Sequence, residues 1–226
     1  MQGSPPASQA LLAPFWHTRA LIFLLLAVAL AGLTLDPQLT SPAAASKFTS
    51  SYLPLLVVNS TLVLYASGFG LQRPLFRELL GDLQPAHLAR QLGWSAALVA
   101  LVLLAEAALQ FWLGMPESLW AHALLPRGAG ELTGWIVLST IIGCTEELVY
   151  RGYLRRQLAA LSGSAALGVL LQGLLFGVAH GQQGQWAVAR FAFYGVAFGY
   201  VAARERSILP CVLCHVGLDV YAGVVG

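Results

Sequence analysis

The sequence has few charged residues: only 10% of its 226 residues are Asp, Glu, Lys or Arg, whereas 58% are hydrophobic. About 25% of the residues in a soluble domain are charged, so this composition excludes an ordinary soluble protein and indicates one that lies in a lipid bilayer. The net charge of +2 is too small to indicate nucleic-acid binding. Three cysteines, all in apolar surroundings, exclude the disulfide framework of a small secreted protein.

Seven apolar runs, bounded by charged residues or by Gly and Pro, are candidates for membrane-spanning helices, which need about 20 mainly apolar residues. They are Ala20 to Leu35, Tyr52 to Leu71, Leu92 to Leu113, Thr133 to Leu161, Ala165 to His180, Trp186 to Ala203 and Ile208 to Val225. We therefore predict an all-α, polytopic integral membrane protein with about seven transmembrane helices.

The N-terminal segment contains turn formers, in GSPPAS, and no apolar periodicity. We expect residues 1–17 to be disordered. The first apolar run could instead be a signal peptide, because Arg19 precedes it and small residues follow at PAAAS, so the sequence leaves open whether residues 1–45 are cleaved. The long gap between the run and those alanines favours a retained helix.

The basic residues are distributed unevenly between the two sides of the membrane. Cytoplasmic loops are enriched in Lys and Arg, so this bias indicates the orientation. With a cytoplasmic N-terminus, nine arginines fall on the inner side and three basic residues, Lys47, Arg127 and Arg190, fall outside. We expect a protein of the cytoplasmic (inner) membrane with its N-terminus in the cytoplasm.

Two adjacent carboxylates interrupt the fourth run, in GCTEELVYRGYL at 143–154. An ionised group at bilayer depth costs on the order of a few kcal/mol, so their presence needs a reason. Glu147 and Arg151 are four residues apart and can form a structural ion pair on one helix face. Glu146 points about 100° away and has no basic partner at this spacing, which suits a group that takes up and returns protons.

Two later helices carry further polar groups at the same spacing. Phe176 and His180 share a helix face in FGVAH, as do His215 and Asp219 in HVGLD. A single histidine could form an interhelical hydrogen bond and nothing more. Polar groups on three helices, however, predict one hydrated cavity, because ionisable side chains avoid lipid.

The turn expected in LSGSA, at 161–165, brings two of these groups to the same depth. Glu146 lies about as many residues before Gly163 as His180 lies after it. Antiparallel helices rise equally, by about 1.5 Å per residue, so the two side chains are expected at one level.

Cys211, Cys214 and His215 also spell C-x-x-C-H, the motif of covalent haem attachment. Haem is normally attached on the extracytoplasmic side, whereas the predicted orientation places this motif near the cytoplasmic end of the last helix. We interpret the two cysteines as small apolar residues of a membrane helix.

These groups resemble three motifs of the CPBP family, which is also called ABI. The matching positions are E-E-x-x-x-R at Glu146, Glu147 and Arg151, F-x-x-x-H at Phe176 and His180, and H-x-x-x-D at His215 and Asp219. The family contains CAAX prenyl endopeptidases and bacteriocin-processing and self-immunity proteins. The resemblance covers residues 131–226 and implies a catalytic membrane domain built from the last four helices, preceded by N-terminal transmembrane helices over 18–130.

The resemblance implies a glutamic-type intramembrane protease. Glu146 and His180 would activate a water for attack on a peptide carbonyl, and His215 with the residue at 219 would stabilise the oxyanion. Such roles are physically reasonable, because a general base must reach the water and donors aimed at developing charge contribute strongly to catalysis.

The same resemblance implies that Glu147 and Arg151 hold the helix and the first carboxylate in place. One position departs from the family, since Asp219 stands where the prenyl endopeptidases typically have Asn. An ionised Asp cannot donate to an oxyanion. Either Asp219 is protonated by burial, or it accepts from His215 and fixes that imidazole as the donor, which is the interpretation we favour.

Zinc is an alternative means of activating water. Its possible ligands are Glu146, His180, His215 and Asp219. The zinc-protease motif H-E-x-x-H is absent from the sequence, and the family resemblance points away from a metal. We expect no cofactor.

The function predicted from these patterns is that of an endopeptidase that cleaves a membrane-associated or lipid-modified protein or peptide. Two alternatives remain: a non-catalytic immunity or scaffold protein that binds a peptide in the same cavity, and a proton-coupled transporter, which uses similar buried groups. The expected partners are membrane lipid and a peptide or protein substrate, with no nucleic acid.

Overall fold

The structure, a computed structural model, describes residues 11–34, 47–70, 79–114 and 119–225. Within these ranges every regular element is a helix, which confirms the all-α fold. In chain order they are α1 (Phe15–Thr34), η2 (Phe48–Tyr52), α2 (Leu53–Gly70), α4 (Pro85–Leu113), α5 (Leu119–Leu124), α6 (Ala129–Glu147), η3 (Leu148–Leu154), α7 (Arg155–Ser162), α8 (Ala165–Ala179), η4 (Gly181–Gln183), α9 (Gln185–Glu205) and α10 (Leu209–Val225).

The apolar helical segments correspond to the seven predicted runs and confirm a polytopic integral membrane protein. Five are long and apolar enough to cross a bilayer: Phe15–Leu33, Phe48–Gly68, Pro85–Leu113, Ala129–Ser162 and Trp186–Glu205. The other two, α8 and α10, are shorter. With 15 residues, α8 is about 22 Å long and falls short of the roughly 30 Å of a hydrocarbon core.

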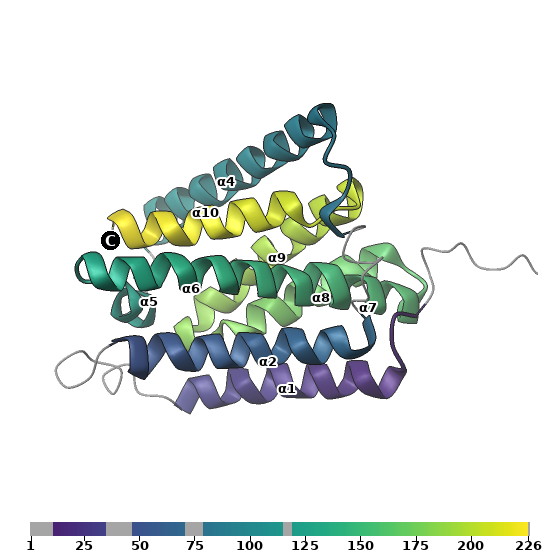
Figure 1. Ribbon diagram of the computed structural model, residues 1–226, viewed down its shortest axis with the longest axis horizontal. Coiled ribbons are helices and arrows are strands. Elements are labelled where there is room, and N and C mark those ends of the chain that lie inside the picture. The colour runs from purple at the N-terminus through teal and green to yellow at the C-terminus, as the bar shows by residue number, and fades with distance from the viewer. Residues whose placement is uncertain (1–10, 35–46, 71–78, 115–118, 226) are drawn as a thin grey trace, which may run out of the picture.

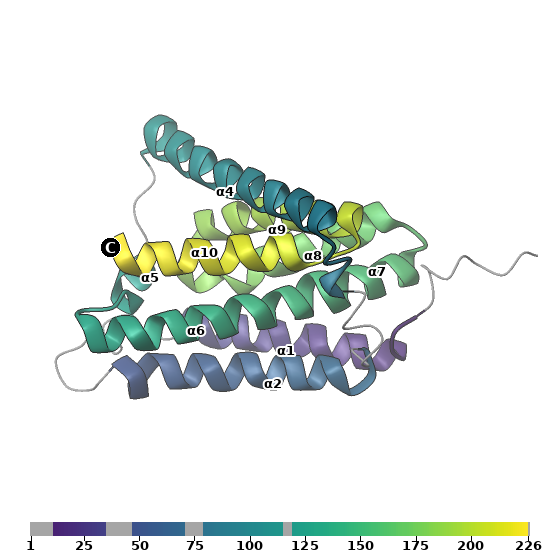
Figure 2. The same ribbon diagram turned by 45° about the horizontal axis from the view of Figure 1, so that its top comes forward.

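The helices pack side by side as a bundle (Figure 1). The α1 and α2 helices lie at one side, α6 and α10 occupy the middle, and α8 and α9 lie behind α6 in this view. Turning the molecule shows that α4 crosses α10 at an angle on the opposite side (Figure 2). The motif-bearing helices α6, α8 and α10 therefore share the interior of the bundle.

The turn expected at 161–165 is confirmed. The α7 helix ends at Ser162, and the next residue, Gly163, has a φ of 68°, a left-handed conformation that favours glycine. Ser164 then caps α8 by accepting a hydrogen bond from Leu167 N at 3.3 Å. The continuous helical segment formed by α6, η3 and α7 thus reverses directly into α8.

The N-terminal segment differs from the predicted disorder of residues 1–17. Positions 1–10 lie outside the described residues, but 11–17 have a defined structure and include the first turn of α1. The side-chain amide of Gln157 donates to the carbonyl of Ala13 at 2.7 Å. This hydrogen bond joins residues that are far apart in the sequence, and it needs no apolar periodicity in the N-terminal segment. The sequence pattern therefore did not reveal it.

Glycines allow α8 and α9 to approach closely, because small residues let the backbones of membrane helices come together. A Cβ added to Gly173 would lie 2.6 Å from Val196 Cγ2 and 2.8 Å from its backbone nitrogen. A Cβ added to Gly177 would lie 2.3 Å from the carbonyl oxygen of Val188. This contact fixes the hairpin that carries the F-x-x-x-H motif.

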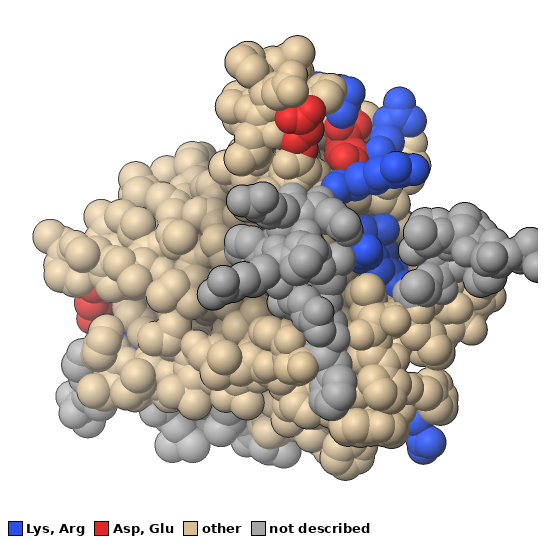
Figure 3. All heavy atoms as spheres, turned by 45° about the vertical axis from the view of Figure 1, so that its right-hand side comes forward, with Lys and Arg blue, Asp and Glu red and all other residues tan. Residues whose placement is uncertain are grey.

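Basic side chains gather towards one end of the bundle, while most of the surface seen there is uncharged (Figure 3). At this end the start of α4 meets the end of α9, where Arg90 Nε donates to Glu205 Oε2 at 2.7 Å. Such an asymmetry is expected of a membrane protein with one cytoplasmic face.

Substitution of Gly173 by Ala tests the α8–α9 contact. Because the new methyl group meets Val196 side chain and backbone, overpacking should destabilise the protein by about 1–3 kcal/mol. Thermal unfolding in detergent measures the loss. Gly93→Ala is the matched control, since its Cβ meets nothing within 4 Å among the described residues, and it should unfold at or slightly above the wild-type temperature. Equal behaviour of the two variants would show that the contact is not tight.

Candidate active site

The helix that carries the adjacent carboxylates changes its winding directly after them. Residues Leu148–Leu154 form the π-helical segment η3, which contains Arg151. Such segments are rare in proteins and occur frequently at functional sites. The sequence pattern predicts regular α-helix over this stretch and does not indicate the change.

The predicted ion pair between Glu147 and Arg151 is present and completely buried. Arg151 Nη1 lies 3.0 Å from Glu147 Oε1, and both side chains are 0% exposed. His215 Nδ1 lies 2.9 Å from the same carboxylate oxygen. The guanidinium also stacks over two aromatic rings, with centroid distances of 4.2 Å to Phe176 and 5.1 Å to Phe198. One buried charge cluster therefore joins residues of α6, η3, α8, α9 and α10.

His215 stands between three carboxylates. Its Nε2 lies 3.9 Å from Glu146 Oε2 and 3.7 Å from Asp219 Oδ2, which are ion-pair contacts too long for hydrogen bonds. The hydrogen bond expected from His215 to Asp219 is formed with Glu147 instead. The backbone of Asp219 is held separately, because Trp135 Nε1 donates to its carbonyl at 2.8 Å.

Glu146 points away from this ion pair and into a cavity of about 100 Å³. The polar residues that line the cavity are Asn59, Glu146, Tyr150, His180 and Gln182, and aliphatic side chains of α1 and α2 complete its wall. One water molecule needs roughly 10–15 Å³ of such space, so the cavity has room for water next to polar partners. Glu146 Oε2 is buried and has no hydrogen-bond partner among the residues that the structure describes.

His180 reaches the cavity from the end of α8, because that short helix stops at Ala179. Its Nδ1 lies 2.8 Å from the carbonyl oxygen of Phe176. A carbonyl only accepts, so Nδ1 carries the hydrogen and the neutral ring has its lone pair on Nε2. The ring stacks on Phe191 at 4.1 Å, which fixes its plane. Nε2 is therefore the nitrogen that can accept a proton.

The structure brings the six predicted site residues together in two adjoining groups. Two line the cavity: Glu146 and His180. The other four form the charged cluster: Glu147, Arg151, His215 and Asp219. The contact between Glu146 and His215 joins the groups. Asp219 lies at the edge of the cluster, with 35% of its side chain exposed.

Three polar residues of the cavity were not identified from the sequence. Asn59 was detectable, because an amide inside an apolar membrane span is unusual. Gln182 follows His180 closely and ends an apolar run, which is a weaker signal. Tyr150 carried no signal, since a tyrosine in a membrane helix is usually a packing residue.

Glu106 is paired with Arg190 and is not among the residues that line the cavity. Its Oε2 lies 3.0 Å from Arg190 Nη1, and Tyr194 donates its hydroxyl to Oε1 at 2.8 Å. The cysteines of the C-x-x-C-H motif are fully buried, and Cys211 Sγ lies 3.3 Å from the carbonyl of Phe198. The Glu106–Arg190 pair and the buried cysteines are therefore contacts between helices.

The possible zinc ligands are histidines and acids of these same two groups. Across the described ranges, no group of three or more His, Cys, Asp or Glu side chains is arranged to hold a metal ion. The expectation of a site without a cofactor stays a prediction.

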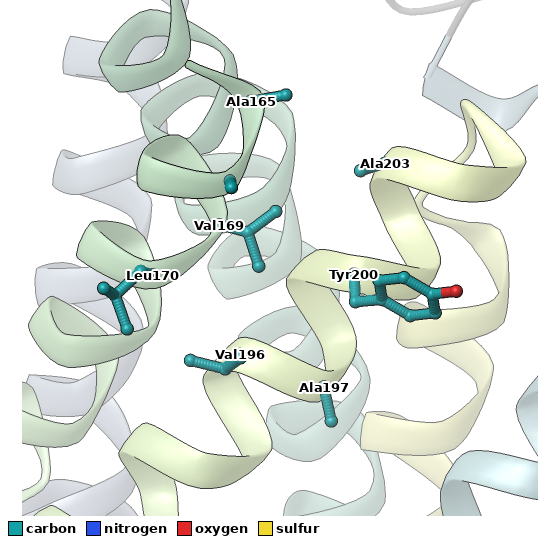
Figure 4. Close-up of a pocket in the computed structure, with 8 residues that line it drawn as sticks. Ala165, Val169, Leu170, Val196, Ala197, Tyr200 and Ala203 are labelled. Atoms are coloured by element: carbon teal, nitrogen blue, oxygen red, sulfur yellow. The ribbon is translucent and has the colours of Figure 1, made fainter. Parts of the chain in front are cut away.

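A larger hollow of about 460 Å³ lies between α8 and α9. Figure 4 shows residues that line it: Val169 and Leu170 on α8, and Val196, Ala197 and Tyr200 on α9. Small apolar side chains dominate its lining. Its lining contains no carboxylate and no imidazole, the two kinds of group that line the smaller cavity.

These features define a polytopic membrane protein with a carboxylate and an imidazole at an internal polar cavity. The family model described as type II CAAX prenyl endopeptidase Rce1-like matches residues 128–221. The matched residues contain all three motifs, and the match confirms their resemblance to the CPBP family of CAAX proteases. No curated protein and no solved structure matches the chain.

Substitution of Arg151 by Leu tests the buried charge cluster. It leaves Glu147 without its counter-ion in the bundle interior, which should cost about 3–5 kcal/mol of stability. Thermal unfolding in detergent measures the effect, and adding Glu147→Gln to the variant should restore part of it. Arg90→Leu is the control, because its partly exposed pair with Glu205 should contribute no more than about 1 kcal/mol. A loss no greater than that of the control would contradict the assigned role.

Proposed function

We propose that this protein is an intramembrane endopeptidase that cleaves a membrane-associated or lipid-modified peptide with a water activated by Glu146 and His180. The match to a family of CAAX endopeptidases supports a peptide hydrolase. The observation that carries the proposal is the shared cavity: Glu146 and His180 both line it, and its volume of about 100 Å³ admits water.

In this mechanism the water lies between the Glu146 carboxylate and His180 Nε2. One of these groups takes a proton from the water as its oxygen adds to the peptide carbonyl. The tetrahedral intermediate then collapses, the carbon–nitrogen bond breaks, and the proton passes to the departing nitrogen. The hydrogen bond from Nδ1 to the Phe176 carbonyl keeps Nε2 directed to this task.

In this mechanism the charged cluster supplies a hydrogen-bond donor and positions Glu146. His215 donates its Nδ1 hydrogen to Glu147 and, in its protonated form, presents an Nε2–H to negative charge in the site. Glu147 and Arg151 position both His215 and the backbone that carries Glu146. Asp219 is placed to attract the same imidazole over 3.7 Å.

The location of the site favours a substrate that is itself in the membrane. The cavity lies among apolar helices, and a lipid-modified peptide is concentrated in the bilayer by its chain. We also propose a cytoplasmic N-terminus and a cytoplasmic basic end, as the nine-to-three distribution of Lys and Arg indicates.

Substitutions at the two groups that activate water test this function. Glu146→Gln and His180→Ala should each lower kcat by about 10²–10⁴-fold, because each removes a proton acceptor. The assay follows cleavage of an internally quenched farnesylated peptide with a C-terminal CAAX sequence, by protein reconstituted in lipid vesicles. Thermal unfolding verifies that each variant is folded.

Two controls match these changes in chemistry. Glu106→Gln removes an intramembrane carboxylate that does not line the cavity, and His87→Ala removes a histidine near the start of α4. Both should keep most of the activity. If the protein were a non-catalytic scaffold or immunity protein, Glu146→Gln would leave its function unchanged. Unchanged cleavage by either test variant would refute the proposed function.

A further inference from the structure

Peptide hydrolysis at this cavity needs a hydrogen-bond donor for the carbonyl oxygen, which becomes negatively charged. Such donors usually contribute the largest part of the catalysis. The residues that activate water do not supply one, because an ionised Glu146 only accepts and the Nδ1 hydrogen of His180 is bound to Phe176. Neither His215, whose Nε2 lies 3.9 Å from Glu146 Oε2, nor Asp219 is among the residues that line the cavity.

Asn59 offers a donor on the wall formed by α2. Asn59 is only 6% exposed, so its amide is largely removed from water, and a hydrogen bond to it is stronger than one in water. Nδ2 donates to the carbonyl of Leu55 at 3.1 Å. An amide nitrogen has two hydrogens, and therefore one remains for a ligand in the cavity.

The orientation of this amide is coupled to the helix that carries the base. Thr145 Oγ1 lies 3.4 Å from Asn59 Oδ1, and Thr145 directly precedes Glu146. With the oxygen turned towards α6, the nitrogen is the atom left for a substrate. Tyr150 also lines the cavity, but it lies on the same helix face as Glu146, whereas Asn59 comes from a different helix.

Gln182 provides the complementary group. Its Oε1 is buried and has no hydrogen-bond partner within the part of the chain that the structure describes. A buried acceptor without a partner is costly, and a peptide N–H would satisfy it. A donor at Asn59 and an acceptor at Gln182 together match the two polar groups of a peptide backbone.

We propose that Asn59 is a further catalytic residue, whose Nδ2–H donates to the carbonyl oxygen of the scissile peptide, and that Gln182 Oε1 binds a peptide N–H of the same substrate. This inference rests on the proposed function. It also extends the active site beyond the matched region of residues 128–221, because α2 lies outside it.

Kinetics of variants at these two positions separate the roles. Asn59→Leu and Asn59→Asp both remove the N–H, and the second keeps the shape and the acceptor for Thr145. Each should lower kcat about 10²–10³-fold with little change in KM. Gln182→Leu should raise KM by about 2- to 10-fold with little change in kcat. The assay uses the farnesylated CAAX peptide and the full chain in lipid vesicles.

Thr61→Val is the control on the same helix, since that hydroxyl is exposed and bonds only to Val57 of its own helix among the described residues. It should retain wild-type kinetics. If Asn59→Asp keeps its full kcat, or if both Asn59 variants change only KM and thermal stability, the donor role is overturned. An unchanged KM for Gln182→Leu overturns the second assignment.

The kinetics of these variants also distinguish failure of the Asn59 and Gln182 assignments from failure of the proposed protease function. If Glu146→Gln is inactive while the Asn59 variants are fully active, the protease function stands and the donor role falls. If wild-type protein and all variants leave the peptide uncleaved, both proposals fail.

Discussion

The buried pair of Glu147 and Arg151 constrains the rest of the site. Charges in the interior of a membrane bundle are stable only when they are paired, and this pair is fully enclosed. Arg151 packs against aromatic rings of α8 and α9, and Glu147 binds His215 of α10. A shift of any of these helices would expose a charge to an apolar environment, so the pair holds the bundle in one arrangement.

Two neighbouring carboxylates thereby acquire different environments. Glu147 faces its ion pair, whereas Glu146 faces a cavity that contains other polar side chains, among them His180 and Asn59. The short α8 helix contributes the second group, because it ends at Ala179 and the next residue, His180, lines the cavity. Helix length and charge pairing together place a carboxylate and an imidazole at one pocket beside an otherwise apolar core.

The sequence predicted those features that depend on spacing within one helix or hairpin. The seven apolar runs, the ion pair four residues apart and the glycine turn at Gly163 belong to this kind. Features that depend on how helices rotate against each other were not predictable in this way. Examples are the contribution of Asn59 to the cavity and the choice of Glu147 over Asp219 as the partner of His215. The π-helical segment at Leu148–Leu154 was not predicted either, because its residues give no periodic signal in a single sequence.

An experimental structure of the protein in lipid, at a resolution that shows ordered water, tests the central claim most directly. The account predicts a water molecule in the cavity within about 2.6–3.2 Å of both the Glu146 carboxylate and His180 Nε2. A dry cavity, or a Glu146 side chain separated from His180 by packed apolar groups, would contradict it.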